Sequence, residues 1–232
     1  MKIDIVTLFP NMFKGPFDES IIQRARDKSL VEINIHNLRR WAKDKRGTVD
    51  DRPYGGGPGM ILRVDVIDEA LKALKPPATS LPRRQAGHQP PARIILLDPK
   101  GEMFNQAKTK QLSKLDHLIL ICGHYEGVDA RVDKLVDEKI SIGKYVLTGG
   151  ELPAMVIVDS VVRLLPGALG NPESLKEESY SQSLTNHKSQ ITNHTQYPQY
   201  TRPADYRGLK VSKVLLSGNH AKIRKWRQDH SK

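Results

Sequence analysis

The glycine-rich stretch at residues 141–153 constrains the fold more than any other part of the sequence. It reads SIGKYVLTGGELP, and an apolar pattern with helical spacing follows over residues 154–165. This order predicts a strand end, a tight loop and a helix. Glycines let a backbone approach a ligand closely, and the free N–H groups at a helix start favour such a site. A turn that only connects a strand to a helix explains the stretch equally well, so other parts of the chain must decide.

Strand and helix patterns alternate through the first 170 residues. Residues 2–8, 31–38, 93–97, 117–121 and 139–142 have strand patterns, and helical patterns occur within residues 11–30, 64–75, 105–115, 128–136 and 154–165. Residues 44–59 are predicted to be a loop, and the Pro-rich residues 75–92 an irregular connection. This alternation predicts an α/β fold with a mostly parallel sheet.

Three glycine-containing loops directly follow predicted strands, at residues 98–101, 122–127 and 141–150. Ligands bind at the carboxyl ends of strands in open parallel sheets, so the three loops favour a pocket over a simple turn. None of them has the Gly-x-Gly-x-x-Gly pattern of an ordinary dinucleotide site. Residues 55–59 also fail as a phosphate-binding loop of a nucleotide hydrolase, because Met60 follows where that motif needs lysine.

Composition narrows the class of protein further. The chain has 232 residues, a net charge of +11 and one cysteine, Cys122, which excludes an internal disulfide and favours a reducing compartment. Its start lacks the pattern of a signal peptide, and its most apolar segment is too short and too charged to span a bilayer. We therefore expect a soluble cytoplasmic protein without a membrane partner. Basic clusters lie beside Trp41 and Trp226, which favours a nucleic acid partner.

The composition changes after Gly170. Residues 171–200 are rich in Ser, Thr, Asn and Gln and are predicted to be a flexible linker. Residues 201–232 are predicted to form a small basic domain, with an extended segment at 210–216 and a capped helix at 220–229. His187 and His194 in the linker have no accompanying Cys or carboxylate pattern, so no metal site is predicted.

The motifs of this chain resemble those of the bacterial tRNA (guanine-N1)-methyltransferase family of the SPOUT class. The matching residues follow the family's order along nearly the whole chain and comprise residues 8–10, 12–13, 49–60, 122–123, 125–127, 141–155, 159–161, 163, 166–167, 200–203 and 215–221. The resemblance implies methylation of N1 of the guanine after the anticodon, position 37, with S-adenosylmethionine as methyl donor. It also implies a deep trefoil knot at the end of the α/β domain, a small mainly helical C-terminal domain that grips tRNA, and a homodimer whose active sites lie at the subunit interface.

The resemblance also assigns the cofactor-binding residues. The three knot loops would hold S-adenosylmethionine in a bent form, and the residues predicted to bind it are Leu97, Pro99, Gly101, Gly123, Tyr125, Glu126, Gly127, Ser141, Ile142, Gly143, Lys144, Tyr145, Val146, Leu147, Gly149, Gly150 and Pro153.

The predicted reaction needs a base for the N1 proton and a cation or donor for the charge that builds on O6. Arg163 stands at the family's catalytic arginine position and is assigned to O6. Glu178 stands where the family has an aspartate in the linker and is assigned as the base. The alternative for Glu178 is a solvated acidic cluster with no catalytic role. Mg²⁺ is a candidate ion, without a defined protein site.

Contacts with tRNA are predicted in both parts of the chain. Asp50 and Arg52 lie on the loop that approaches the target nucleotide in the family, although a structural turn explains Arg52 almost as well. Phosphate contacts are assigned to Lys222, Arg224, Lys225 and Arg227.

The chain departs from the family pattern in several places. His124 replaces a usual arginine, Gln196 stands where an acid is common, the linker is long, and the sequence stops soon after Trp226 without the usual basic tail. The altered linker keeps a second hypothesis open, namely a non-catalytic tRNA-binding protein with the same fold.

Overall fold

The computed structural model describes residues 1–75, 92–175, 178–180 and 196–231. It divides the chain into two compact units, Met1–Gly170 and Asn171–Lys232. Most of the connection predicted at residues 75–92 and of the linker predicted at residues 171–200 lies outside the described residues.

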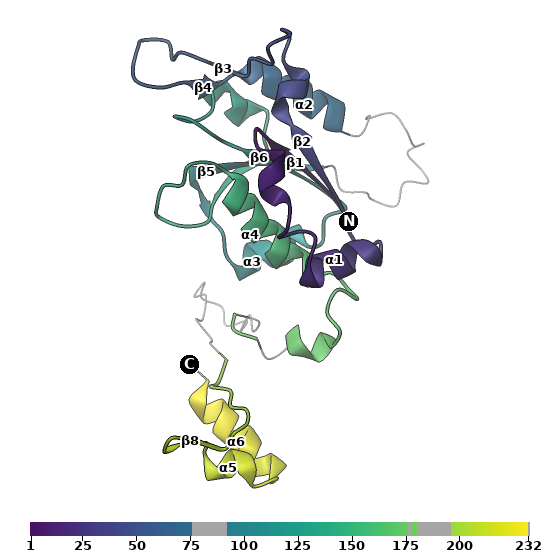
Figure 1. Ribbon diagram of the computed structural model, residues 1–232, viewed down its shortest axis with the longest axis vertical. Coiled ribbons are helices and arrows are strands. Elements are labelled where there is room, and N and C mark those ends of the chain that lie inside the picture. Colours follow the sequence, from purple (N-terminus) through teal and green to yellow (C-terminus); the bar gives the residue numbers. More distant parts are fainter. Residues whose placement is uncertain (76–91, 176–177, 181–195, 232) are drawn as a thin grey trace, which may run out of the picture. The chain divides into compact units, whose positions relative to one another are not determined.

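A five-stranded parallel sheet forms the centre of the first unit (Figure 1). Its strands lie in the order β2-β1-β6-β5-β7, and every pairing between neighbours is parallel. The strands are β1 (Lys2–Thr7), β2 (Glu32–Asn37), β5 (Arg93–Met103), β6 (His117–Cys122) and β7 (Glu138–Ser141). The predicted α/β class with a mostly parallel sheet is confirmed.

Helical segments cover both faces of the sheet and bury two apolar layers. On one face lie α1 (Ser20–Asp27), α3 (Gln106–Leu112), α4 (Glu151–Val162) and the 3₁₀ turn η1 (Pro10–Phe13). On the other lie α2 (Val64–Leu74) and the 3₁₀ turns η2 (Leu38–Trp41) and η3 (Ala130–Lys134).

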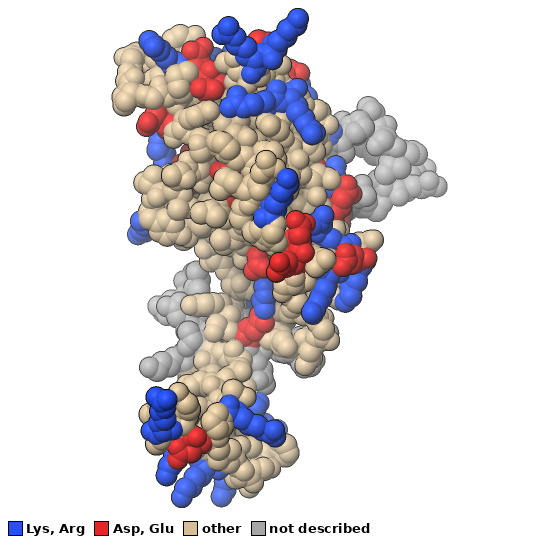
Figure 2. Space-filling model, viewed as in Figure 1, with Lys and Arg blue, Asp and Glu red and all other residues tan. Residues whose placement is uncertain are grey.

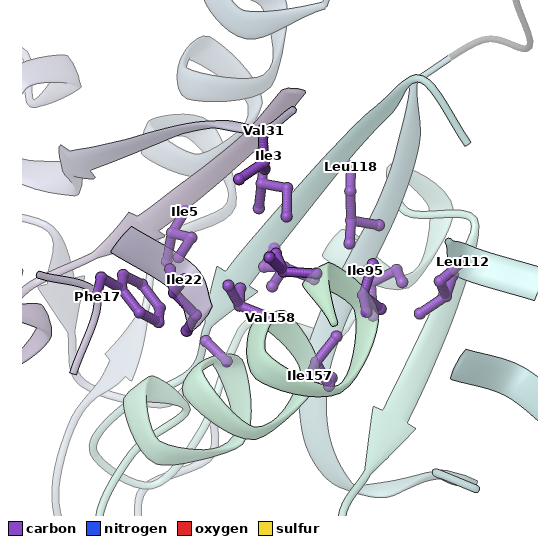
Figure 3. Packing of buried hydrophobic residues seen from close by; sticks show 14 of the residues in the cluster. Ile3, Ile5, Phe17, Ile22, Val31, Ile95, Leu112, Leu118, Ile157 and Val158 are labelled. Atoms are coloured by element: carbon purple, nitrogen blue, oxygen red, sulfur yellow. The ribbon is translucent and has the colours of Figure 1, made fainter. Parts of the chain in front are cut away.

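Strand side chains alternate between these two layers, as the pleat requires. In β5, Ile95 and Leu97 belong to the α4 side, while Ile94 and Leu96 belong to the α2 side. Ile157 and Val158 of α4 pack toward the strands in Figure 3. Because both faces are covered, the inner strand β6 and the first half of β5 are apolar along most of their length.

A short antiparallel hairpin joins the sheet to one of the predicted ligand loops. It consists of β3 (Asp50–Asp51) and β4 (Ile61–Leu62), so the loop predicted at residues 44–59 contains one short strand. The N–H of Leu62 donates to the carbonyl of Gly127 at 3.0 Å, and the N–H of Glu126 donates to that of Met60 at 3.0 Å. The hairpin is therefore fixed to the loop that follows β6.

The prediction that residues 98–101 form a loop at the end of a strand is wrong. β5 continues to Met103, with a register shift between Leu97 and Glu102, after which Glu102 and Met103 pair with β7. Pro99 and Gly101 suggested a turn, but here they mark a bulge inside a long strand. A Cβ at Gly101 would collide with the backbone of Ile140, so the glycine allows this close approach.

The helix predicted at residues 128–136 is reduced to η3, five residues long. The N–H of Asp129 donates to the carbonyl of Leu62 at 3.0 Å, outside any helix. The Asp129 carboxylate accepts from both the N–H and the guanidinium of Arg131. These contacts hold the start of the segment in a capped turn and prevent a regular helix.

The described part of the second unit contains two α-helices and a small hairpin. They are α5 (Lys213–Leu216), α6 (His220–His230), β8 (Asp205–Tyr206) and β9 (Leu209–Lys210), after a 3₁₀ turn η4 (Pro172–Leu175). The extended segment predicted at residues 210–216 is therefore wrong over its second half, because α5 packs on α6 and tertiary contact decides the state of so short an apolar run. The predicted cap of α6 is confirmed, since the Asn219 side chain accepts from the N–H of Lys222 at 3.1 Å.

A buried carboxylate lies between the first three strands of the sheet order. Asp4 of β1 accepts from His117 at 2.6 Å and from His36 at 2.8 Å, and Lys2 lies 3.1 Å away. Burial alone would raise the pKa of Asp4, but the hydrogen bonds from His117, His36 and Lys2 outweigh it and hold this pKa well below its ordinary range. The charged form is therefore the one that the fold stabilises.

We expect Asp4→Asn to lower the free energy of unfolding at neutral pH by about 3–5 kcal/mol, since it leaves cationic or donor groups around a buried neutral amide. Because the folded pKa is depressed, this stabilisation is complete above about pH 4 and is lost as pH falls through the folded pKa. Urea unfolding from acid to neutral pH measures both effects. The exposed pair of Asp18 with Arg26 gives the control, Asp18→Asn, which should change stability far less, because solvent screens an exposed ion pair. An equal loss in the two variants would contradict the role of Asp4.

Candidate functional site

A cavity of about 290 Å³ opens at the carboxyl ends of β5, β6 and β7. Its wall comes from the segments that follow or interrupt these three strands, together with the first turn of α4. The lining residues are Leu97, Asp98, Pro99, Lys100, Gly123, His124, Tyr125, Glu126, Gly127, Val128, Ile140, Ser141, Ile142, Gly143, Tyr145, Val146, Leu147, Thr148, Gly149, Gly150 and Pro153. All residues that the sequence assigned to a cofactor, except Gly101 and Lys144, lie in this wall.

The two exceptions have different surroundings. Gly101 lies beneath the wall against the backbone of Ile140, where it shapes the bulge of β5. Lys144 is exposed within the loop at residues 142–150.

Two of the cavity loops are joined directly to each other. The N–H of Gly150 donates to the carbonyl of Gly123 at 2.9 Å, and His124 forms an isolated antiparallel bridge with Gly149. A Cβ at Gly150 would lie 2.6 Å from the Cα of Cys122 and 2.9 Å from the nitrogen of Gly123. The glycine is therefore required by the close approach of two backbones.

The loop at residues 142–150 is ordered by its own short contacts. The Ser141 hydroxyl donates to the carbonyl of Gly143 at 2.9 Å, and the ring of Tyr145 occupies the place of a side chain at Gly143. In the opposite wall Tyr125 has a φ of +60° and Gly127 a φ of +132°. A tyrosine in the left-handed region is uncommon, and such backbone strain clusters at ligand sites.

An acidic group beneath the cavity was not singled out from the sequence. Glu151, in the first turn of α4, is buried, and its Oε1 accepts from the Thr7 hydroxyl at 2.7 Å. The partial positive charge at the N-terminus of α4 stabilises the carboxylate of Glu151 in its first turn. Burial raises the pKa of the Cys122 thiol, and the charge of Glu151 raises it further, so the cysteine is not a nucleophile. The signal for Glu151 in the sequence was its position as an acidic residue directly after the Gly149-Gly150 pair.

His124, which the sequence showed only as a replacement of a usual arginine, lies in the cavity wall. Its ring lies 4.8 Å from that of Phe9 and 4.9 Å from that of Tyr125, and its Nδ1 is buried without a hydrogen-bond partner among the described residues. A Cβ at Gly149 would meet both Nδ1 of His124 and Oε2 of Glu151. The absence of a side chain at Gly149 therefore leaves room for both polar groups.

Arg163 does not line the cavity. It caps the C-terminal end of α4, whereas Gly150 and Pro153 place the cavity at the N-terminal end. At 1.5 Å per residue the two ends are about 15 Å apart along the helix axis. Glu178 belongs to the second unit and is half-buried there.

The residues predicted to contact tRNA fall into two groups. Asp50 and Arg52 lie on the hairpin beside the cavity loop, with Arg52 exposed. On α6, Lys222, Arg224 and Lys225 are exposed, while the guanidinium of Arg227 lies 4.9 Å from the centre of the Tyr197 ring. Arg227 is thus packed within the second unit, unlike the other three.

Among the described residues, no cluster of three or more His, Cys, Asp or Glu side chains is placed to hold a metal ion. In the same part of the chain, none of the helices has the length and apolar character needed to cross a bilayer.

Comparisons with known proteins cover the entire chain. A family model described as tRNA (Guanine-1)-methyltransferase TrmD matches residues 1–232. A protein named tRNA (guanine-N(1)-)-methyltransferase from Dictyoglomus turgidum is 53% identical over 228 residues, which are 98% of this chain and 84% of the relative. Proteins of the same name from Moorella thermoacetica and Bacillus subtilis are 50% and 51% identical over 232 residues, covering 100% of this chain and 85% and 87% of theirs.

Proposed function

The chain belongs to the tRNA (guanine-1)-methyltransferase family, and from this premise we propose that it methylates N1 of the guanine that follows the anticodon in tRNA, position 37, in the cytoplasm. The observation that carries the proposal is the glycine-lined cavity at the carboxyl ends of β5, β6 and β7, in a chain that matches the family along its whole length. The methyl donor is S-adenosylmethionine, which the family implies.

The chemistry of the cavity fits this donor. Its size is close to the lower end of the range for small-molecule sites, about 300 Å³. Leu97, Val146 and Leu147 offer apolar contacts for a purine, and the backbone at Gly149 and Gly150 forms part of the cavity wall. Glu126 supplies a carboxylate for a cationic group. When bound, S-adenosylmethionine supplies a methyl group that its positively charged sulfur activates for transfer.

The remaining chemistry belongs to the chain's own side chains. The reaction forms a bond from carbon to N1, breaks the bond from carbon to sulfur, and releases the N1 proton. We assign the proton to the carboxylate of Glu178 and the growing charge on O6 to the guanidinium of Arg163. These two residues would act only when tRNA brings the guanine to the cavity.

The position of Arg163 supports a homodimer with shared active sites. A residue about 15 Å along α4 from its own cavity cannot reach a methyl group bound there, so we assign it to the cavity of the partner subunit. An exposed apolar surface supports the same arrangement. Leu152 and Val156 are 50% and 43% exposed on one face of α4, and Phe9 and Met12, in or next to η1, which contacts α4, are 40% and 44% exposed.

We also propose the trefoil knot of this family. The segment at residues 142–150 leaves the edge strand β7 and hydrogen-bonds to the loop of the inner strand β6. Because this hydrogen bond brings the chain after β7 back past β5 to the loop of β6, it supports a path in which the end of the first unit passes through an earlier loop. A crystal structure with the whole path traced would test it, and an unthreaded path would refute it.

We expect Glu178→Gln to lower the single-turnover rate of methyl transfer about 10²–10⁴-fold, because glutamine keeps the shape but cannot accept the N1 proton. Affinity for S-adenosylmethionine should stay at the wild-type value. Asp229→Asn, an exposed acid of the same unit, is the matched control and should leave the rate unchanged. A wild-type rate in the Glu178 variant would exclude it as the base.

Transfer of a labelled methyl group to tRNA transcripts tests the function itself. We expect transfer to a transcript with G after the anticodon and none to the same transcript with A. Activity on both would refute the stated specificity. Cofactor binding without transfer to either would instead favour a non-catalytic tRNA-binding protein.

A further inference from the structure

A tight turn at residues 44–48 presents basic side chains on the first unit, and we refer to it as the basic turn. The carbonyl of Asp44 accepts from the N–H of Gly47 at 3.1 Å, and Gly47 has a φ of +72°. The Asp44 carboxylate accepts from the N–H and the hydroxyl of Thr48, both at 2.8 Å. Lys45 and Arg46 occupy the two central positions of this closed turn, so their side chains point away from it.

The basic turn is also held against the 3₁₀ turn that precedes it. The guanidinium of Arg39, in η2, donates to the carbonyl of Gly47 at 2.9 Å. A Cβ at Gly47 would lie 3.3 Å from the Cβ of Arg39, so the glycine lets the two segments pack closely. A turn fixed in this way loses little conformational entropy when its side chains bind a ligand.

Three cations, one in η2 and two in the basic turn, have no ion-pair partner among the described residues. Arg40, Lys45 and Arg46 are exposed and form no ion pair in the described part of the chain. Asp65, which pairs at 3.4 Å with Lys43 directly before the turn, also pairs with Arg63 at 2.9 Å. Figure 2 shows Lys and Arg gathered at the end of the first unit that carries α2 and β3. Cations left without partners on a rigid surface suit an anionic partner with regularly spaced charges.

The basic turn is connected to the cavity by backbone hydrogen bonds. It runs directly into β3, where the carbonyl of Val49 accepts from the N–H of Arg63 at 2.8 Å. The other strand of this hairpin, β4, is bonded through Leu62 to Gly127 of the cavity wall. An RNA strand held at the turn would therefore lie next to the hairpin that borders the cavity.

From these observations we propose that Arg40, Lys45 and Arg46 bind backbone phosphates of the substrate tRNA and guide it along the hairpin to the cavity. This inference rests on the proposed function, because it takes the anion to be tRNA. The three side chains contact no base, so they add affinity without selecting the nucleotide.

The test compares two double variants that remove the same charges. Lys45→Ala/Arg46→Ala removes the tip of the basic turn, and Arg24→Ala/Lys114→Ala removes one arginine and one lysine from α1 and the end of α3, on the other face of the sheet. Affinity for tRNA is measured with S-adenosylhomocysteine bound, at salt concentrations from about 50 to 200 mM. We expect the first variant to bind tRNA about tenfold more weakly and to reduce the slope of log affinity against log salt by about 2. The control should keep the wild-type slope, and both should keep wild-type cofactor affinity.

Arg40→Ala should reduce the slope by about 1 more when it is added to the first variant. An unchanged slope in Lys45→Ala/Arg46→Ala overturns the inference, and so does an equal change in the control, which would indicate net charge alone. These outcomes differ from a failure of the proposed function, in which the wild-type enzyme itself transfers no methyl group to tRNA.

Discussion

Arg163→Ala should lower the rate of methyl transfer about 10²–10³-fold while S-adenosylmethionine still binds with wild-type affinity. The loss has this size because the guanidinium is assigned to charge that develops only in the transition state, and removal of one such donor costs about 3–4 kcal/mol. Cofactor affinity is preserved because Arg163 caps the end of α4 opposite the cavity. Single-turnover kinetics and calorimetric binding measure the two quantities.

A mixed dimer tests the proposed homodimer with shared active sites and shows which subunit supplies the arginine. One chain carries Arg163→Ala and the other carries Leu147→Trp, whose indole fills the cavity and prevents cofactor binding. Each homodimer should be inactive. In the mixed dimer, the cavity of the first chain meets the intact Arg163 of the second, so one of the two sites should work.

Absence of activity in the mixed dimer would assign Arg163 to the cavity of its own chain. If Arg163 served the cavity of its own chain, each chain of the mixed dimer would carry a defect, and no activity would appear. Leu147 suits the experiment because it is 37% exposed in a loop, so its replacement should not unfold the core. Thermal unfolding of both homodimers checks that point.

The sequence predicted the sheet and the cavity well because both depend on local patterns. An apolar run such as β6, bounded by turn residues and placed between helical patterns, favours a covered parallel strand, and the glycines at 123, 149 and 150 marked places where backbones meet. The family resemblance supplied residue roles that no pattern contains. Arg163, for instance, appears in the sequence as one arginine at a helix end.

Two of the failures arise from contact between segments far apart in the chain. Pro99 and Gly101 suggested that β5 ends, yet the strand resumes because β7 pairs with Glu102 and Met103. The helix expected at residues 128–136 shortened because Leu62 takes the N–H of Asp129. The sequence assigned no role to His124 or Glu151, since only the fold brings both side chains to Gly149.

Gly150→Ala should destabilise the protein by about 3 kcal/mol and weaken S-adenosylmethionine binding more than tenfold. The backbone of Gly150 has a φ of −83°, which alanine adopts freely, so the cost is purely steric. The added methyl would meet backbone atoms of Cys122 and Gly123, which cannot rotate away as a side chain can. The contact between the two cavity loops must open, and the cavity wall moves with it.

Alanine at Gly149 and at Gly170 should each have a smaller effect than alanine at Gly150, so the three variants form a graded series. The three atoms nearest to the methyl of Gly149→Ala belong to the side chains of Glu151 and His124, which can move, so this variant should fold with a smaller loss of stability but still weaken cofactor binding. Gly170→Ala meets nothing within 4 Å and should stay within about 0.5 kcal/mol of wild type. Urea unfolding and cofactor titration of all three variants test the order. Equal cofactor affinity in the variants at 149 and 170 would show that the wall formed by residues 149–150 does not hold the ligand, even if the variant at 150 does not fold.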